Sequence, residues 1–120
     1  MCVMYKDRID LYHEIEDHRN SKLLVYITGD RPNLETKIAA DVLNIFLEHL
    51  DLIGSVPKIS LYLYTRGGDT LASWSIANLI RQFCADFEII ISSKAHSGGT
   101  LICLGANSIV MTKQATLGPI

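Results

Sequence analysis

The sequence contains few cysteines, no long apolar run and no excess of charge of one sign. Its three cysteines, Cys2, Cys84 and Cys103, form no C-x-x-C pair, which argues against a disulfide framework and favours a reducing compartment. No apolar stretch approaches the roughly 18 residues that a membrane-spanning helix needs, so we expect a soluble, cytoplasmic domain. Eleven basic and 13 acidic residues give a net charge of −2. This balance argues against nucleic acid as a partner.

The sequence also lacks the motifs of common metal and nucleotide sites. No two of its four histidines have the i, i+4 spacing of a helical ligand pair. Two glycine turns, Thr65–Asp69 and Ala95–Gly99, match neither the P-loop pattern nor the G-x-G-x-x-G pattern. We therefore expect neither a metal ion nor a cofactor.

What the chain does contain is an alternation of strand-like and helix-like segments. Its 120 residues fit a single domain, residues 1–120, that would bury roughly two-thirds of its unfolded surface. Apolar runs of strand length cover 23–27, which is typical of a strand buried on both faces, and 59–64, 87–91 and 108–112. Helical periodicity covers 7–18, 37–50 with Asn33 as its N-cap, 71–83 and 100–106. This order predicts an α/β fold with a largely parallel sheet, built from β-α-β units and flanked by helices.

Each glycine turn follows an apolar run and precedes a helical pattern. The carboxyl ends of parallel strands meet at one edge of a sheet, where open α/β sheets bind ligands, so we expect the two turns to face each other. Glycine lets backbone N–H groups approach a reacting carbonyl, and the hydroxyl of Ser97 on the same rim could attack that carbonyl. Alternatively, Ser97 and Asp69 could each serve as the N-cap of the helix that follows.

Three motifs resemble, in order and spacing, those of a known protease family. They are Tyr64–Asp69, Ser93–Leu101 and Leu104–Met111. They are similar to the serine dehydrogenase proteinase family of Clp-fold serine proteases, which is related to the signal peptide peptidase A group and more distantly to the proteolytic subunit of Clp. The resemblance covers residues 19–120 and implies the Clp/crotonase-like fold.

The resemblance implies a role for each residue of the two turns. Ser97 would attack a peptide carbonyl, and the N–H groups of Gly68 and Gly98 would hold the oxyanion. Gly67 would shape the loop, and a peptide or protein substrate would add as an extended strand beside the residues after Gly68, beginning with Asp69. Arg66 stands where the family usually has proline, and it places a cation at the cleft.

The general base, either a histidine held by a carboxylate or a lysine kept neutral by burial, is the part of the site that the sequence leaves open. In the related proteases the base comes later in the chain than residue 120, so we expect the domain to be truncated at its C-terminus. Lys113, which follows the last strand-like run, is the candidate within the chain, and its alternative role is that of a solvated lysine. His96 is adjacent to Ser97, and we expect its side chain to point elsewhere.

Two other functions fit the same pattern. A crotonase-like acyl-CoA enzyme would use the same pair of backbone donors around a thioester oxygen, with Ser97 incidental. A non-catalytic assembly module would use the fold only to form a ring. We expect a homo-oligomer whether the domain is a protease or an assembly module. The sequence does not identify a regulatory or membrane-associated partner.

Overall fold

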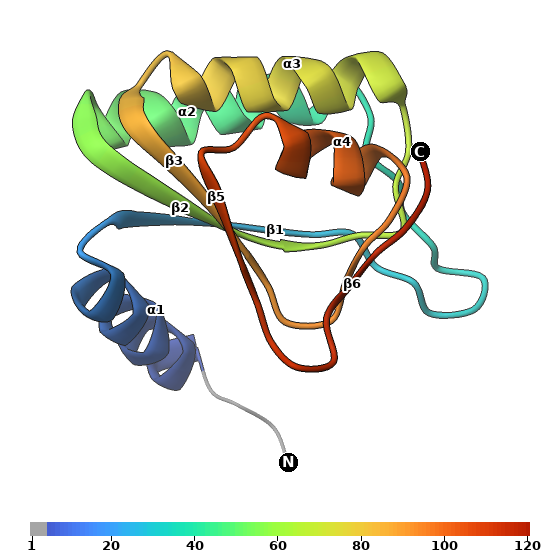
Figure 1. Cartoon of the computed structure of the whole chain (residues 1–120), viewed down its shortest axis with the longest axis horizontal. Coiled ribbons are helices and arrows are strands. Elements are labelled where there is room, and N and C mark those ends of the chain that lie inside the picture. Colours follow the sequence, from blue (N-terminus) through green and yellow to red (C-terminus); the bar gives the residue numbers. More distant parts are fainter. Residues whose placement is uncertain (1–4) are drawn as a thin grey trace.

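A parallel sheet carries the fold and confirms the predicted α/β class (Figure 1). The computed structural model describes residues 5–120, which form one four-stranded sheet in the order β1-β2-β3-β5 and a small pair of strands, β4 and β6. The helices are α1 (Tyr5–Arg19), α2 (Val42–Ile53), α3 (Thr70–Arg81) and α4 (Gly98–Leu104). The strands are β1 (Lys22–Ile27), β2 (Val56–Tyr64), β3 (Cys84–Ile91), β4 (Lys94–Ala95), β5 (Ser108–Met111) and β6 (Thr116–Leu117).

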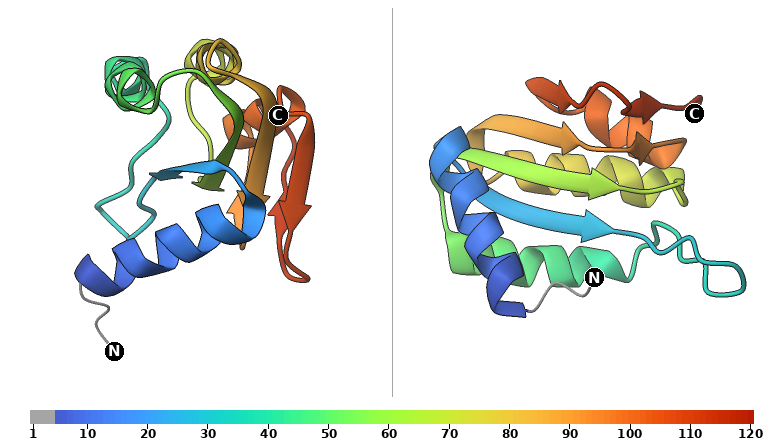
Figure 2. Two further views of the ribbon diagram at one scale, coloured as in Figure 1. Left: turned by 90° about the vertical axis from the view of Figure 1, so that its left-hand side faces the viewer. Right: turned by 90° about the horizontal axis from the view of Figure 1, so that it is seen from below.

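The core lies between the sheet and the helices α2 and α3, which cover one face, whereas α1 lies on the other (Figure 2). Alternate residues of the two central strands point into this core and are fully buried, as Leu61 and Ile89 are. From α3, Ile76 and Ile80 pack against them, also with no exposed surface. Between residues 5 and 120, no helix combines the length and the apolar character needed to cross a membrane.

The strand β1 departs from the expectation that both of its faces are buried. Leu24 alone among its residues is buried, and the side chains of Val25 and Ile27 are 37% and 56% exposed. The reason is topological, because β1 is an edge strand and the helix on that face, α1, covers it incompletely. An apolar run has the same appearance in a sequence whether its strand is central or at the edge.

The helix α2 begins later than its periodicity predicts. It starts at Val42 instead of residue 37, and Asp41 stands at the N-cap position without a side-chain cap hydrogen bond. Asn33 is not the cap, since it lies in a preceding turn with a φ of +64°. The residues between are drawn away from helical geometry because Ile38 forms a parallel bridge with Gly68. A long-range backbone pairing has overridden a local helical pattern.

The helix α1, predicted over 7–18, is present, but none of the residues Tyr5–Arg19 is fully buried. Its C-terminal end is fixed by Glu88, a carboxylate on β3 that is 1% exposed. Two guanidinium nitrogens of Arg19 donate hydrogen bonds to the Glu88 carboxylate, and the Nε bond is 3.2 Å long. Ser60 Oγ donates to the same carboxylate at 2.6 Å, and Lys58 Nζ lies 3.4 Å from it. Burial opposes ionisation, yet these donors and charges lower the pKa of Glu88 to about 2.

The two described cysteines are free thiols. Cys103 is buried in α4, and burial raises its pKa to about 11. Cys84 is partly buried at the start of β3, and burial also raises its pKa. Both thiols are therefore protonated at neutral pH and behave as small core residues. Cys2 lies outside the described residues.

Candidate active site

The two glycine turns lie side by side at the carboxyl edge of the sheet, as the sequence predicts. Thr65, just after β2, bridges to β4, whose end carries the second turn. The N–H of Thr65 donates to the carbonyl of Lys94 at 3.1 Å, and the N–H of His96 donates to the carbonyl of Thr65 at 3.0 Å. This pair of bonds fixes Thr65–Asp69 against Ala95–Gly99.

The glycines of the two turns lie so close to their neighbours that an added Cβ would collide with them. A Cβ at Gly67 would lie 2.6 Å from the Cβ of Ser97, and one at Gly98 would lie 2.3 Å from Ser73 Oγ. A Cβ added at Gly98 would also lie 3.5 Å from the backbone nitrogen of Gly68. Gly67 and Gly68 have positive φ values of +115° and +154°. The structure therefore brings Ser97, Gly68 and Gly98 into one small region.

Ser97 has a backbone conformation that non-glycine residues rarely adopt. Its φ is +52° and its ψ is −115°, which costs on the order of 1–3 kcal/mol. Ser97 precedes α4 but makes no side-chain cap hydrogen bond, so the structure does not support the N-cap alternative. A strained serine at a strand-to-helix turn presents its hydroxyl at the edge of the sheet, as nucleophilic serines do.

The backbone of Gly68 is oriented by its pairing with Ile38. The N–H of Ile38 donates to the carbonyl of Gly67 at 2.9 Å, and the N–H of Asp69 donates to the carbonyl of Ile38 at 2.8 Å. Successive residues of an extended chain direct their polar groups to opposite sides. The N–H and the carbonyl of Gly68 therefore point away from Ile38.

A cavity of about 530 Å³ opens beside these groups. Its lining combines the first glycine turn, the nucleophile candidate and the segment that pairs with Gly68. The lining residues are Lys37, Ile38, Ala39, Arg66, Gly67, Gly68, Asp69 and Ser97. Four residues assigned to the site from the sequence, Arg66, Gly67, Gly68 and Asp69, thus share one cavity with Ser97.

Buried hydroxyl groups and a helix cap hold the first turn. Thr65 Oγ1 accepts the N–H of Gly67 at 2.9 Å and the hydroxyl of Thr28 at 2.8 Å. Asp69 caps α3, because its Oδ1 accepts the N–H of Ala72 at 3.0 Å. Its carbonyl accepts the hydroxyl of Ser73 at 2.8 Å. The capping role of Asp69, one of the alternatives raised by the sequence, is present in the structure.

The basic residues near the second turn are not gathered around Ser97. His96 Nε2 lies 2.9 Å from Thr116 Oγ1 on β6, and a Cβ on Gly118 would contact the imidazole ring at 2.8 Å. The side chain of His96 is thus directed to β6, as expected. Lys113 is exposed in the turn after β5 and is not among the residues that line the Ser97 cavity.

The structure adds Lys37 to the site. Because the helical periodicity predicts that a helix begins at residue 37, the sequence gives no reason to place this lysine at the edge of the sheet. The extended segment around Ile38 instead places Lys37 on the wall of the cavity, where Arg66 also lies. The connection from β1, which ends at Ile27, to α2, which begins at Val42, is long enough to cross the site.

Comparison with known proteins gives the family of this domain. The family model for ClpP-like SDH-type serine proteinases matches residues 2–120. The chain belongs to this family. The resemblance drawn from the three motifs is thereby confirmed, as is the fold class that it implied.

Two relatives of this chain are uncharacterized proteins of Methanocaldococcus jannaschii. One is 41% identical over 76 residues, which are 61% of this chain and 27% of the relative. The other is 44% identical over 62 residues, which are 52% of this chain and 21% of the relative. The matched part thus spans about a quarter of the length of these curated relatives.

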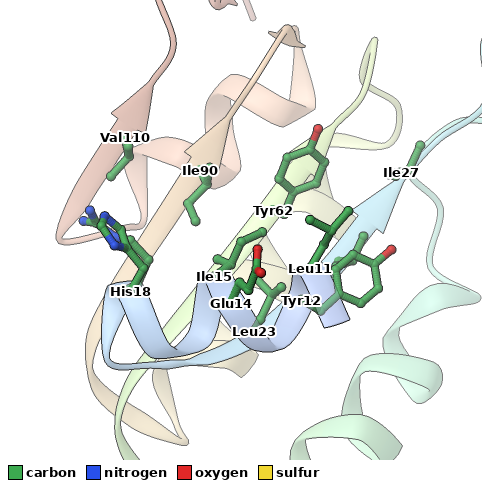
Figure 3. A pocket seen from close by; sticks show the side chains of 12 residues that line it. Leu11, Tyr12, Glu14, Ile15, His18, Leu23, Ile27, Tyr62, Ile90 and Val110 are labelled. Atoms are coloured by element: carbon green, nitrogen blue, oxygen red, sulfur yellow. The ribbon is translucent and has the colours of Figure 1, made fainter. Parts of the chain in front are cut away.

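The domain has a second and larger cavity under α1 (Figure 3). Its volume is about 830 Å³, and it separates α1 from the face of the sheet that α2 and α3 leave free. Most of its lining is aliphatic or aromatic. The lining residues are Leu11, Tyr12, Glu14, Ile15, His18, Arg19, Leu23, Val25, Ile27, Tyr62, Ile90 and Val110. This cavity contains neither glycine turn and no serine, so the nucleophile candidate belongs to the smaller cavity.

Proposed function

We propose that this serine proteinase domain hydrolyses peptide bonds through an acyl-enzyme on Ser97. The observation that carries the proposal is the position of Ser97 on a strained turn beside the amides of Gly68 and Gly98. The Oγ of Ser97 attacks the carbonyl carbon, and the two amides donate hydrogen bonds to the oxyanion. Each such donor contributes roughly 3–4 kcal/mol to the transition state. The amine leaves with a proton, and water then releases the acyl group.

The substrate lies in this proposal as an extended strand on the free edge of the first turn. Ile38 occupies one edge of the Gly67–Asp69 backbone, and the polar groups of Gly68 point to the other edge. A peptide that adds there forms main-chain hydrogen bonds and brings a carbonyl toward Ser97. Since these bonds involve only backbone groups, they bind peptides irrespective of their side chains.

The proton of Ser97 passes to a general base. In this proposal the base is Lys113 or a lysine outside residues 5–120. A lysine can take this part only when its ammonium group is desolvated enough to lose its proton. For Lys113, which is exposed after β5 and does not line the Ser97 cavity, that requires both a movement toward Ser97 and burial by a substrate or by another subunit.

Labelling with a fluorophosphonate probe tests the nucleophile. The wild-type domain should be labelled, and Ser97→Ala should lose the label. The matched control is Ser55→Ala, because Ser55 is an exposed serine in the connection between α2 and β2. Equal labelling of wild type and Ser97→Ala, or no labelling of wild type, contradicts the proposal. Thermal stabilisation by an acyl-CoA but not by peptides would instead favour the crotonase-like reaction.

A further inference from the structure

The cavity beside Ser97 carries two cationic side chains from separate segments of the chain. Lys37 comes from the extended segment before α2, and Arg66 comes from the turn after β2. Among residues 5–120, the acidic residue that lines this cavity is Asp69, and its Oδ1 is engaged by the N–H of Ala72 at the start of α3. The wall that surrounds the Ser97 hydroxyl therefore has an excess of positive charge.

Arg66 is held in place by Asp30 without being neutralised. Its Nε lies 3.4 Å from Asp30 Oδ2, which leaves the terminal guanidinium nitrogens for another acceptor. The same carboxylate oxygen accepts the hydroxyl of Tyr64 at 2.5 Å and lies 3.8 Å from Lys94 Nζ. One carboxylate cannot compensate two cations, so the cluster of Asp30, Arg66 and Lys94 keeps a net positive charge.

Lys37 is fixed through its backbone while its side chain stays in solvent. Its neighbour Thr36 donates its N–H to the carbonyl of Gly29 at 2.8 Å, and its other neighbour, Ile38, donates to Gly67 at 2.9 Å. The side chain of Lys37 is exposed. A solvated ammonium group on an anchored backbone suits the recognition of an anion, whereas a general-base lysine needs burial.

We propose that this cleft selects peptides with acidic residues beside the scissile bond. A glutamate or aspartate carboxylate of the bound peptide pairs with Lys37 and with the free guanidinium nitrogens of Arg66. Backbone pairing to Gly68 supplies affinity that does not depend on sequence, and the two cations add the preference. The relevance of this preference to cleavage rests on the proposed function of Ser97, whereas the binding of an acidic peptide requires no chemical step.

Binding to the Ser97→Ala protein tests the recognition apart from catalysis. Two fluorescent peptides that differ only in carrying two glutamates or two glutamines are compared by fluorescence polarisation. The glutamate peptide should bind about five- to tenfold more tightly at low ionic strength, and the ratio should fall as salt is raised. In Lys37→Gln combined with Arg66→Gln, the ratio should fall to about one.

The matched control is Lys22→Gln, which removes an exposed cation at the opposite end of β1 and should keep the preference. A charge reversal, Lys37→Glu with Arg66→Glu, should transfer the preference to a peptide with two lysines. Equal affinity for the glutamate and glutamine peptides, or a preference that persists in the double variant, overturns the proposal. A retained preference in a protein whose Ser97 resists fluorophosphonate rejects the hydrolysis and leaves the recognition standing.

Discussion

The backbone of Ile38 lies against Gly68 so closely that a methyl group on Gly68 would come within 2.3 Å of the Ile38 carbonyl oxygen. The two residues pair as neighbouring strand positions, and this contact orients the Gly68 amide toward the cavity of Ser97. The orientation of the Gly68 amide thus depends on the segment around Ile38, which contributes no group to the reaction itself.

The variant Gly68→Ala should disable the site. The added methyl would collide with backbone atoms of Ile38, which cannot rotate away as a side chain can. We expect the rate of fluorophosphonate labelling to fall by about 100-fold or more, the effect of losing one oxyanion donor. Gly54→Ala is the control, because Gly54 has a φ of +74° but nothing within 4 Å of an added Cβ. A similar loss of labelling in both variants would mean that general backbone strain, not the Gly68 amide, is responsible.

The variant Gly98→Ala should be destabilised by a collision that a second substitution relieves. Its Cβ would lie 2.3 Å from Ser73 Oγ but 3.4 Å from Ser73 Cβ. We expect a loss of about 1–3 kcal/mol in the free energy of unfolding, measured in urea. Adding Ser73→Ala removes the colliding oxygen, so the double variant should be more stable than the sum of the single effects predicts. Strictly additive effects of the two substitutions on the free energy of unfolding would contradict the contact between position 98 and Ser73 Oγ.

The stability of the domain should depend on pH through Glu88. Its pKa is about 2 in the folded protein, below the ordinary 4.5 expected on unfolding. The stabilisation is therefore complete above about pH 5 and is lost as the pH falls toward 2. Integrated over this window it amounts to about 2–3 kcal/mol. Urea unfolding from pH 6 to pH 2.5 should show this loss, and Glu88→Gln should show a shallower slope; parallel slopes would contradict the assignment.

The helix α1 should open before the rest of the domain when its ion pair is removed. No residue of Tyr5–Arg19 is fully buried, and Arg19 binds Glu88 at the end of the helix. Arg19→Gln should speed amide hydrogen exchange within residues 5–19 while β2 and β3 remain protected. His13→Gln serves as the control, since His13 makes an exposed contact of 3.1 Å with Glu16. Unchanged exchange in α1 would show that apolar contacts suffice to hold the helix.

The sequence predicted those features that depend on local patterns. The strand-like runs, the helix α3 and the meeting of the two glycine turns follow from periodicity and from the rule that parallel strands share a carboxyl edge. The place of Lys37 could not be predicted, because the pairing of Ile38 with Gly68 joins distant segments and competes with a plausible helix. The exposure of β1 was missed for a related reason, since strand order decides which apolar run lies at an edge.

The turn after β2 begins at a strand that is paired on both sides, with β1 and with β3. Amides in such a strand exchange only in openings that approach global unfolding, whereas helices at the periphery open at much lower free energy. The strand that carries the first turn therefore persists in openings that release a peripheral helix such as α1. A temporary loss of α1 should leave the start of the turn intact, whereas the position of Gly68 also requires its pairing with Ile38.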